Sequence, residues 1–213
     1  MSDILKIYGG VKMKFKYLTI EREYGSGASI IAKLLSDETN IPCYGREIIE
    51  QLSDEYAIPV ENIEQYEEAA TSSFLYSLFA LGKMQDGDFD MLSTDGKVYV
   101  AEQMIIRKVA DNGPAIFIGR CASEALKGKK GVLKVFITCS NKEEKVNRIV
   151  NEYGINSKDV EYTIKKIDKR RSNYYHANTN KQWKDYGNYD LVLDSGKLGI
   201  EGCVVVLKAL LDC

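Results

Sequence analysis

The chain contains little of what several protein classes require. Only 3 of its 213 residues are proline, which excludes collagen-like and proline-rich architectures. It has a single histidine, and its five cysteines form no C-x-x-C pair, so a zinc cluster is not expected. No window approaches the ~18 consecutive apolar residues of a membrane-spanning helix. These absences predict a globular protein that does not span a membrane.

The scarcity of histidine also limits the chemistry. A Ser-His-Asp or Cys-His nucleophile would need His176 as its base, but His176 lies in a polar run, so hydrolysis of this kind is not expected. The cysteines lie mainly in apolar surroundings, and no secretory apolar segment follows Met1 or the alternative start Met13. Both observations predict a reducing, cytoplasmic location.

The composition that remains is typical of one folded domain over residues 1–213. Apolar residues make up 45% and charged residues 28%, close to the globular average. A chain of this length buries about 70% of its unfolded surface. With 29 basic and 31 acidic side chains, the net charge is −2, so any site for an anion must be local.

Apolar β-branched runs alternate with helically spaced apolar residues. Strands are expected at 15–20, 42–44, 115–118, 132–138 and 189–194. Helices are expected after Gly27, at 45–56, from Pro59, and at 72–84, 97–111, 142–153, 157–176 and 199–211, with a loop at 85–96. Strands 115–118 and 132–138 largely lack polar alternation. Such strands, separated by helices, predict an α/β fold with a parallel sheet covered on both faces.

The segment between the first strand and the first helix has the features of a phosphate-binding loop. Glycines let main-chain N–H groups surround a phosphate, and the following helix N-terminus adds partial positive charge. Aligned to G-x-x-x-x-G-K-S/T with Gly27 as the second glycine, Ala28 falls on the lysine and Ser29 on the hydroxyl. Ser29 is then a candidate Mg²⁺ ligand, and Arg22 is a hypothetical substitute for the lysine. The alternative is a turn that needs glycine only for its geometry.

Two further segments carry candidate phosphate contacts. Arg120 leaves the strand 115–118 at the edge where ligands of open α/β sheets bind, although an isolated arginine there is often only solvated. The run 165–171 holds five cations, and Asp168 and Arg171 share one face of its helix. It suits a lid that brings arginines to a phosphoryl group. The alternatives are a solvated helix face and an RNA or DNA contact, which the net charge disfavours.

Together these segments resemble the cytidylate kinase-like family, in its divergent branch whose loop reads R-E-x-G-S-G-G and also lacks the lysine. The resemblance covers roughly residues 15–211 and rests on the motifs at 20–27, 41–49, 118–120, 168–171 and 189–195. It implies a three-layer P-loop NTPase fold of the nucleoside monophosphate kinase type, with a five-stranded parallel sheet. It also implies a helical substrate-binding insertion at 45–96 and a lid at about 150–187.

The same resemblance implies transfer of the ATP γ-phosphoryl group, with Mg²⁺, to a nucleoside monophosphate such as CMP or dCMP. Arg120 would hold the acceptor phosphate, Asp168 and Arg171 match the lid motif D-x-x-R, and Arg148 matches the arginine that opens the lid. The implied phosphate loop consists of Gly25, Ser26, Gly27, Ala28 and Ser29.

Three positions depart from cytidylate kinases proper. Ala28 replaces the loop lysine, while Gly45 and Cys121 stand where those enzymes carry aspartate. A second function therefore stays open, a nucleotide-binding protein of the same fold without kinase turnover. The sequence also leaves a homo-oligomer open.

Overall fold

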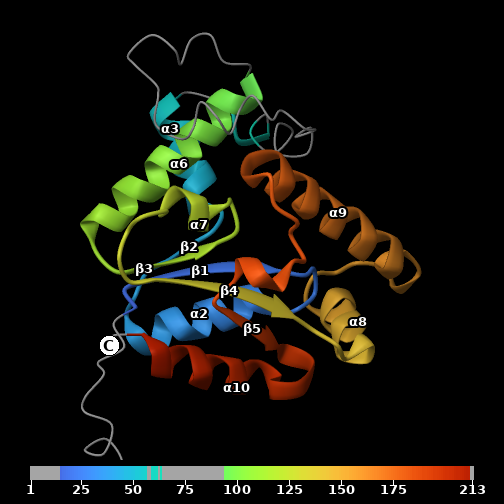
Figure 1. The fold of residues 1–213 in the computed structure, drawn as a ribbon. Helices are drawn as coiled ribbons and strands as arrows, with labels where there is room; N and C mark the ends of the chain where they lie inside the picture. Colours follow the sequence, from blue (N-terminus) through green and yellow to red (C-terminus); the bar gives the residue numbers. More distant parts are fainter. Residues whose placement is uncertain (1–14, 57–58, 62, 64–93, 212–213) are drawn as a thin grey trace, which may run out of the picture.

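The protein folds around a parallel five-stranded sheet with the strand order β2-β3-β1-β4-β5 (Figure 1). The computed structural model describes residues 15–56, 59–61, 63 and 94–211. The strands are β1 (Tyr17–Arg22), β2 (Cys43–Tyr44), β3 (Ala115–Ile118), β4 (Val132–Thr138) and β5 (Leu191–Asp194). The predicted α/β class and five-stranded parallel sheet are confirmed.

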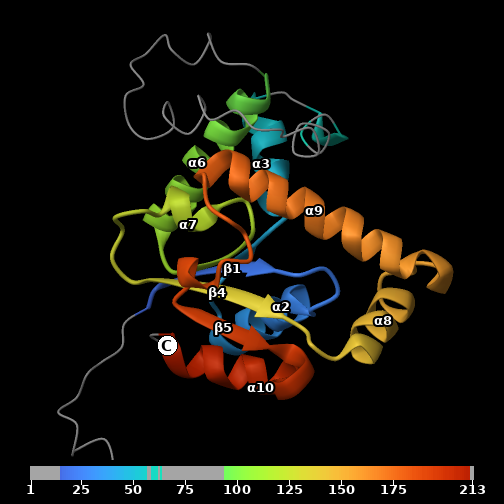
Figure 2. The same ribbon diagram turned by 45° about the vertical axis from the view of Figure 1, so that its right-hand side comes forward.

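Helices cover both faces of the sheet. They are α2 (Ala28–Thr39), α3 (Glu47–Tyr56), α6 (Thr94–Asn112), α7 (Ala122–Ala125), α8 (Lys142–Asn151), α9 (Val160–Thr179) and α10 (Ser195–Leu210). Helices α2 and α10 lie on one face, and α3, α6 and α7 lie on the other. Figures 1 and 2 both place α9 on the side of α6, with α8 beyond the end of β4. Within the described ranges, no helix is both long and apolar enough to cross a membrane.

The central strand β1 shows how strand alternation prepares the site. Its side chains point alternately to the two faces. Leu18 and Ile20 pack into the core with α2 and α10, whereas Tyr17 packs on the opposite side with α3 and α6. Glu21 has the same parity as Tyr17, so a carboxylate faces the α9 side at the end of the strand. Arg22 is the last residue of the strand.

Some element boundaries differ from those predicted. Helix α6 starts at Thr94, so the last three residues of the predicted loop 85–96 are helical. Thr94 and Asp95 are residue types that favour helix N-termini. The predicted helix 72–84 and the rest of that loop lie outside the described residues. The short helix α7 was not predicted, because it has too few residues to show periodicity.

The last helix also starts earlier than the predicted residue 199. Asp194 caps its N-terminus by accepting a hydrogen bond from the Gly196 N–H at 3.0 Å. Gly199 has a left-handed φ of 69° inside the element and kinks it. The periodic apolar pattern of the sequence therefore begins only after the kink.

Truncation of a core side chain under the sheet tests this architecture. Leu18 is fully buried between β1 and the helices α2 and α10. We expect Leu18→Ala to lower the free energy of unfolding by about 2–5 kcal/mol, measured by urea denaturation. Val205→Ala on α10, where the side chain is 67% exposed, is the control, with an expected change within about 0.5 kcal/mol. Equal effects of the two substitutions would contradict the assigned core.

Candidate active site

The turn from β1 into α2 is held in shape by two left-handed glycines. Gly25 has φ 73° and Gly27 has φ 76°, where other L-residues are strained. A Cβ on Gly25 would lie 2.7 Å from Ile149 Cδ1, and one on Gly27 would lie 2.4 Å from Ile200 Cδ1. The two glycines are therefore required by backbone geometry and by the packing of α8 and α10 behind the turn.

The front of this turn opens onto a hollow at the N-terminus of α2. Ser29 is exposed there, whereas Ala28 is only 2% exposed. The first N–H groups of an α-helix have no acceptor within the helix, so they are available to an anion. We call this the loop hollow, and the residues that line it are Arg22, Glu23, Tyr24, Gly25, Gly27, Ala28, Ser29, Tyr153 and Arg171.

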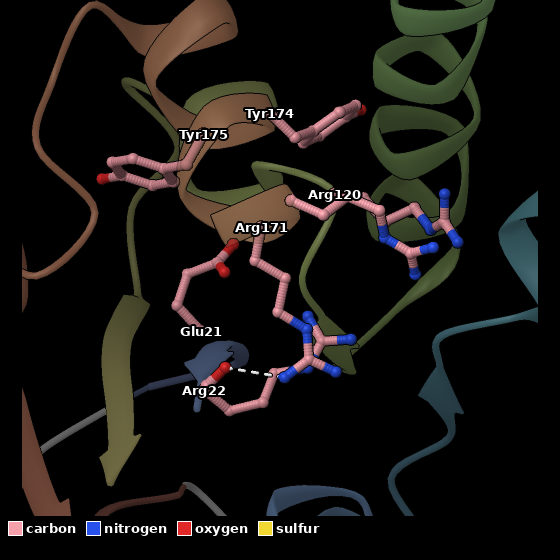
Figure 3. A pocket seen from close by; sticks show the side chains of 7 residues that line it. Glu21, Arg22, Arg120, Arg171, Tyr174 and Tyr175 are labelled. Carbon is pink, nitrogen blue, oxygen red and sulfur yellow. Dashed lines mark hydrogen bonds between the residues drawn. The ribbon is translucent and has the colours of Figure 1, made fainter. Parts of the chain in front are cut away.

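A second hollow is rich in arginine and has one carboxylate in its wall. We call it the arginine hollow, and it is lined by Glu21, Arg22, Arg120, Arg170, Arg171, Tyr174 and Tyr175 (Figure 3). Arg22 and Arg171 line both hollows. Figure 3 shows their guanidinium groups next to each other, while Tyr174 and Tyr175 point in opposite directions. The two hollows therefore meet at a pair of arginines.

Arg22 is partly buried where β1 ends. A Cβ on Gly119 would lie 2.0 Å from Arg22 Nη1, so the side chain crosses from the end of β1 to the end of β3. Its Nε is buried and has no hydrogen-bond partner among the described residues. Burial lowers the pKa of Arg22 and lowers that of Arg171 to about 9, an effect to which the neighbouring Arg22 adds. Two crowded cations and an unsatisfied donor favour a bound anion.

Arg120 enters the arginine hollow from a turn with unusual backbone geometry. Gly119, Arg120 and Cys121 all have positive φ, at 73°, 59° and 51°. The left-handed region costs roughly 1 kcal/mol for each non-glycine residue. The turn is held by a hydrogen bond from Gln103 Nε2 to the Arg120 carbonyl at 3.0 Å. The Arg120 Nη1 group donates to Glu102 Oε1 at 2.7 Å, and Glu102 is fully buried.

The two residues of the D-x-x-R motif both hold the main chain of the phosphate loop. Asp168 Oδ1 accepts from the Tyr24 N–H at 2.7 Å, and Arg171 Nη1 donates to the Arg22 carbonyl at 2.9 Å. Helix α9 is thereby docked on the end of β1. The remaining cations of 165–171 divide between two environments. Arg170 lines the arginine hollow, and the three lysines are exposed.

Arg148 lies elsewhere than its expected catalytic position. Its Nη1 donates to the Gly25 carbonyl at 2.6 Å, and the side chain is buried. It is not among the residues that line either hollow, because α8 packs behind the phosphate loop. Ser26 is also buried, and its carbonyl accepts from Ser195 Oγ at 2.7 Å. The structure thus makes Arg148 a support of the loop.

Glu23 ties the loop to three other segments. Its carboxylate accepts from Thr138 Oγ1 at 2.7 Å, from Lys145 Nζ at 2.8 Å and from Lys184 Nζ at 2.5 Å. Burial raises the pKa of this carboxyl, but the three hydrogen bonds outweigh burial and hold the pKa at about 2. Glu23 is therefore a permanent anion at neutral pH.

The model of the cytidylate kinase-like family matches residues 17–197. The chain belongs to this family. A comparison with curated proteins gives no match. Among solved structures, an uncharacterized protein from Eubacterium ventriosum is 23% identical, with 91% of this chain and 97% of that chain covered and a TM-score of 0.66. Shikimate kinase from Bacteroides thetaiotaomicron is 13% identical, with 92% and 98% covered and a TM-score of 0.50. These likenesses show that this cytidylate kinase-like protein has the fold of the P-loop kinases.

Two carboxylates of this cytidylate kinase-like protein were not predicted as site residues. Glu21 accepts a hydrogen bond from Trp183 Nε1 at 3.1 Å, and burial raises its pKa. Glu102 holds Arg120. The alternation of side chains along a strand could have identified Glu21. Residues 17 and 21 are an even number of positions apart, so their side chains point to the same face of the sheet. Glu102 follows Val98 by four residues, so it shares the buried stripe of its amphipathic helix.

The residues at the loop hollow fit the ATP and Mg²⁺ that the family implies. The helix N-terminus, the lowered pKa values of Arg22 and Arg171 and the unpartnered Arg22 Nε suit phosphate oxygens. The exposed Ser29 is the candidate Mg²⁺ ligand. In the part of the chain that the structure describes, no group of three or more His, Cys, Asp or Glu side chains could hold a metal ion.

The hydrogen bonds of Glu23 predict a dependence of stability on pH. The pKa of Glu23 falls from 4.5 to about 2 in the folded protein, so its carboxylate stabilises the fold above pH 4.5 and this contribution is lost as the pH falls toward 2. We expect Glu23→Gln to lower the free energy of unfolding by about 1–3 kcal/mol at pH 7. The deficit relative to wild type should shrink between pH 4.5 and pH 2 in urea denaturation series. The same substitution at the exposed Glu38 is the control, and a deficit that grows on acidification would contradict the assignment.

Proposed function

We propose that the protein is a nucleotide phosphotransferase that moves the γ-phosphoryl group of ATP to a nucleoside monophosphate, with CMP or dCMP as the expected acceptor. The observation that carries this proposal is the shared position of Arg22 and Arg171 between two adjoining hollows. One hollow has a phosphate-loop backbone, and the other has arginines that suit a second phosphate. A phosphoryl group in transfer must pass between donor and acceptor, where both guanidinium groups meet it.

Catalysis of this transfer is mainly positioning and charge stabilisation. In the proposed arrangement, the α2 N-terminus and the loop amides hold the donor phosphates, while Arg120 and Arg170 hold the acceptor phosphate. Arg22 and Arg171 stabilise the negative charge that develops on the phosphoryl group as it passes from donor to acceptor. A bound Mg²⁺ near Ser29 would neutralise part of the donor charge. The second pKa of an acceptor phosphate is ~6, so the phosphate is largely deprotonated at neutral pH. Its oxygen therefore attacks the γ-phosphorus without a general base.

Arg22 replaces the absent loop lysine in this proposal. Ala28 is buried in the core with α2 and α10 and brings no charged group to the loop hollow. Arg22 instead lies at the hollow, fixed against Gly119 and next to Arg171. Its planar guanidinium offers paired N–H donors to phosphate oxygens, which supports the substitution.

A second candidate function is nucleotide binding without turnover. The observation that favours it is Ala28, because the loop has no side-chain cation at the position from which P-loop kinases usually supply one. In that case the loop and the arginines would bind a polyanion without aligning an acceptor for attack.

An assay with separate acceptors distinguishes the two functions. Protein, ATP and Mg²⁺ are mixed with CMP, dCMP, UMP or AMP, and the nucleoside diphosphate and ADP are quantified together. A mixture without acceptor measures simple ATP hydrolysis. Equal amounts of ADP and of CDP, dCDP or UDP, or two ADP for each AMP consumed, support the transferase. Calorimetric binding of ATP without any diphosphate supports the binding protein.

The role of Arg22 yields a specific kinetic expectation. Arg22→Gln removes the charge but retains a polar side chain, and we expect kcat to fall by roughly 10²–10⁵-fold, as for other donors and arginine fingers. Lys33→Gln removes an exposed cation from α2 and should leave kcat unchanged. Steady-state kinetics with saturating ATP and acceptor give the comparison. An unchanged kcat in Arg22→Gln would remove Arg22 from the proposed mechanism.

A further inference from the structure

A buried carboxylate on α6 joins the acceptor arginine to the lid helix. We propose that Glu102 is a positioning residue, which orients Arg120 toward the acceptor phosphate and couples that orientation to the docking of α9. This inference rests on the proposed function for the identity of the acceptor. It assigns a role to a residue outside the motifs of the family resemblance.

Each oxygen of Glu102 bonds a residue from a different segment. Oε1 accepts from Arg120 Nη1 at 2.7 Å, and Oε2 accepts from the hydroxyl of Tyr174. Arg120 belongs to the turn after β3, and Tyr174 belongs to α9. Both also line the arginine hollow. Glu102 itself is fully buried and is not among the lining residues, so it acts through its two partners.

Two consecutive residues of α6 hold both ends of Arg120. Glu102 binds the guanidinium, and Gln103 Nε2 donates to the Arg120 carbonyl at 3.0 Å. The backbone between these contacts is left-handed at φ 59°, an unfavourable conformation that surrounding contacts must maintain. Helix α6 thus fixes the main chain and the side chain of the acceptor arginine together.

The ion pair between Glu102 and Arg120 is buried on the Glu102 side, unlike an ion pair on the protein surface. Its side chain has no exposure, whereas that of Arg120 retains 17% at the hollow. Burial raises the pKa of Glu102 to about 8, and the hydrogen bond from Tyr174 opposes this rise. The adjacent guanidinium of Arg120 also favours the carboxylate form. A buried pair with fixed geometry holds the guanidinium in one orientation, so an arriving phosphate need not order the side chain.

Tyr174 extends this coupling to the lid. It follows Arg171 by three residues and Arg170 by four, so all three share one side of α9. Asp168 and Arg171 dock the preceding turn of α9 on the phosphate loop. The bond from Tyr174 to Glu102 therefore closes a chain of contacts from the loop through α9 to Arg120.

The first test follows Arg120 itself and does not depend on turnover. In ¹⁵N-arginine-labelled protein, the side-chain N–H signals of Arg120 are assigned by their absence in Arg120→Lys. We expect Glu102→Gln to shift them and to speed their exchange with solvent at least about tenfold, with a smaller effect in Tyr174→Phe. Glu55→Gln makes the same change at an exposed carboxylate that pairs with Lys108 of α6, and it should leave the signals unchanged. Unchanged Arg120 signals in Glu102→Gln would overturn the positioning role.

The second test measures the acceptor side with inorganic phosphate and CMP as probes. We expect Glu102→Gln to weaken the calorimetric affinity for both, and to raise KM for the acceptor, by about 10–100-fold, with KM for ATP unchanged. Tyr174→Phe, which removes one hydroxyl and is the milder variant, should change the same parameters in the same direction. Circular dichroism verifies that each variant is folded.

The outcomes separate this inference from the proposed function. Equal or tighter phosphate binding by Glu102→Gln would show that Glu102 is neutral or competes for Arg120, which overturns positioning while the phosphotransferase stands. If wild type binds neither phosphate nor any nucleoside monophosphate, the proposed function fails, and the acceptor role of Glu102 fails with it.

Discussion

The structure depends on how the main chain between β1 and α2 is held. Four peptide groups between Arg22 and Gly27 are bound by side chains from three helices. A helix N-terminus cannot bind an anion in a defined place unless its approach is fixed. The contacts are Arg171 to the Arg22 carbonyl, Asp168 to the Tyr24 N–H, Arg148 to the Gly25 carbonyl and Ser195 to the Ser26 carbonyl. Charged residues of the family motifs thus hold the main chain of the loop itself. Loss of any one would leave a buried polar group without its partner, which costs more than the bond contributes.

The same contacts hold the guanidinium groups of Arg22 and Arg171 next to each other, where their positive charges repel. Burial and the neighbouring Arg170 lower the pKa of Arg22, and burial and Arg22 lower that of Arg171, while Glu21 and Asp168 oppose both shifts. A polyanion would supply the missing negative charge and the missing acceptor for Arg22 Nε. Such an anion would be held where the two hollows meet. In the proposed transfer, the phosphoryl group would carry its greatest negative charge at the same place. Cation crowding and the proposed chemistry are therefore two aspects of one arrangement.

Sequence patterns predicted the sheet and most helices from local periodicity, and they predicted that Arg22 and Arg120 meet at the shared edge of parallel strands. Arg171 was expected there from its charged helix and from the family resemblance. They could not place Arg148, since whether a residue lies in front of the loop or behind it depends on the packing of α8. Glu102 was missed for a related reason. Its stripe on α6 was visible, but its partners are 18 and 72 residues away along the chain. Long-range pairing of buried charges is not encoded in any local pattern.

Cys121 shows how such pairing compensates for a departure from the family pattern. Where cytidylate kinases proper carry aspartate, this buried thiol contributes no charge beside Arg120. Glu102 of α6 supplies an acidic partner for Arg120, and Glu21 of β1 lines the same hollow as Arg120. Glu21 accepts from the backbone N–H of Cys121 and from Trp183, and Glu102 binds Arg120 directly. These carboxyl groups come from β1 and α6 and not from the turn that carries Arg120. Although the motif lacks its aspartate, Arg120 therefore keeps an acidic hydrogen-bond partner, which another element supplies.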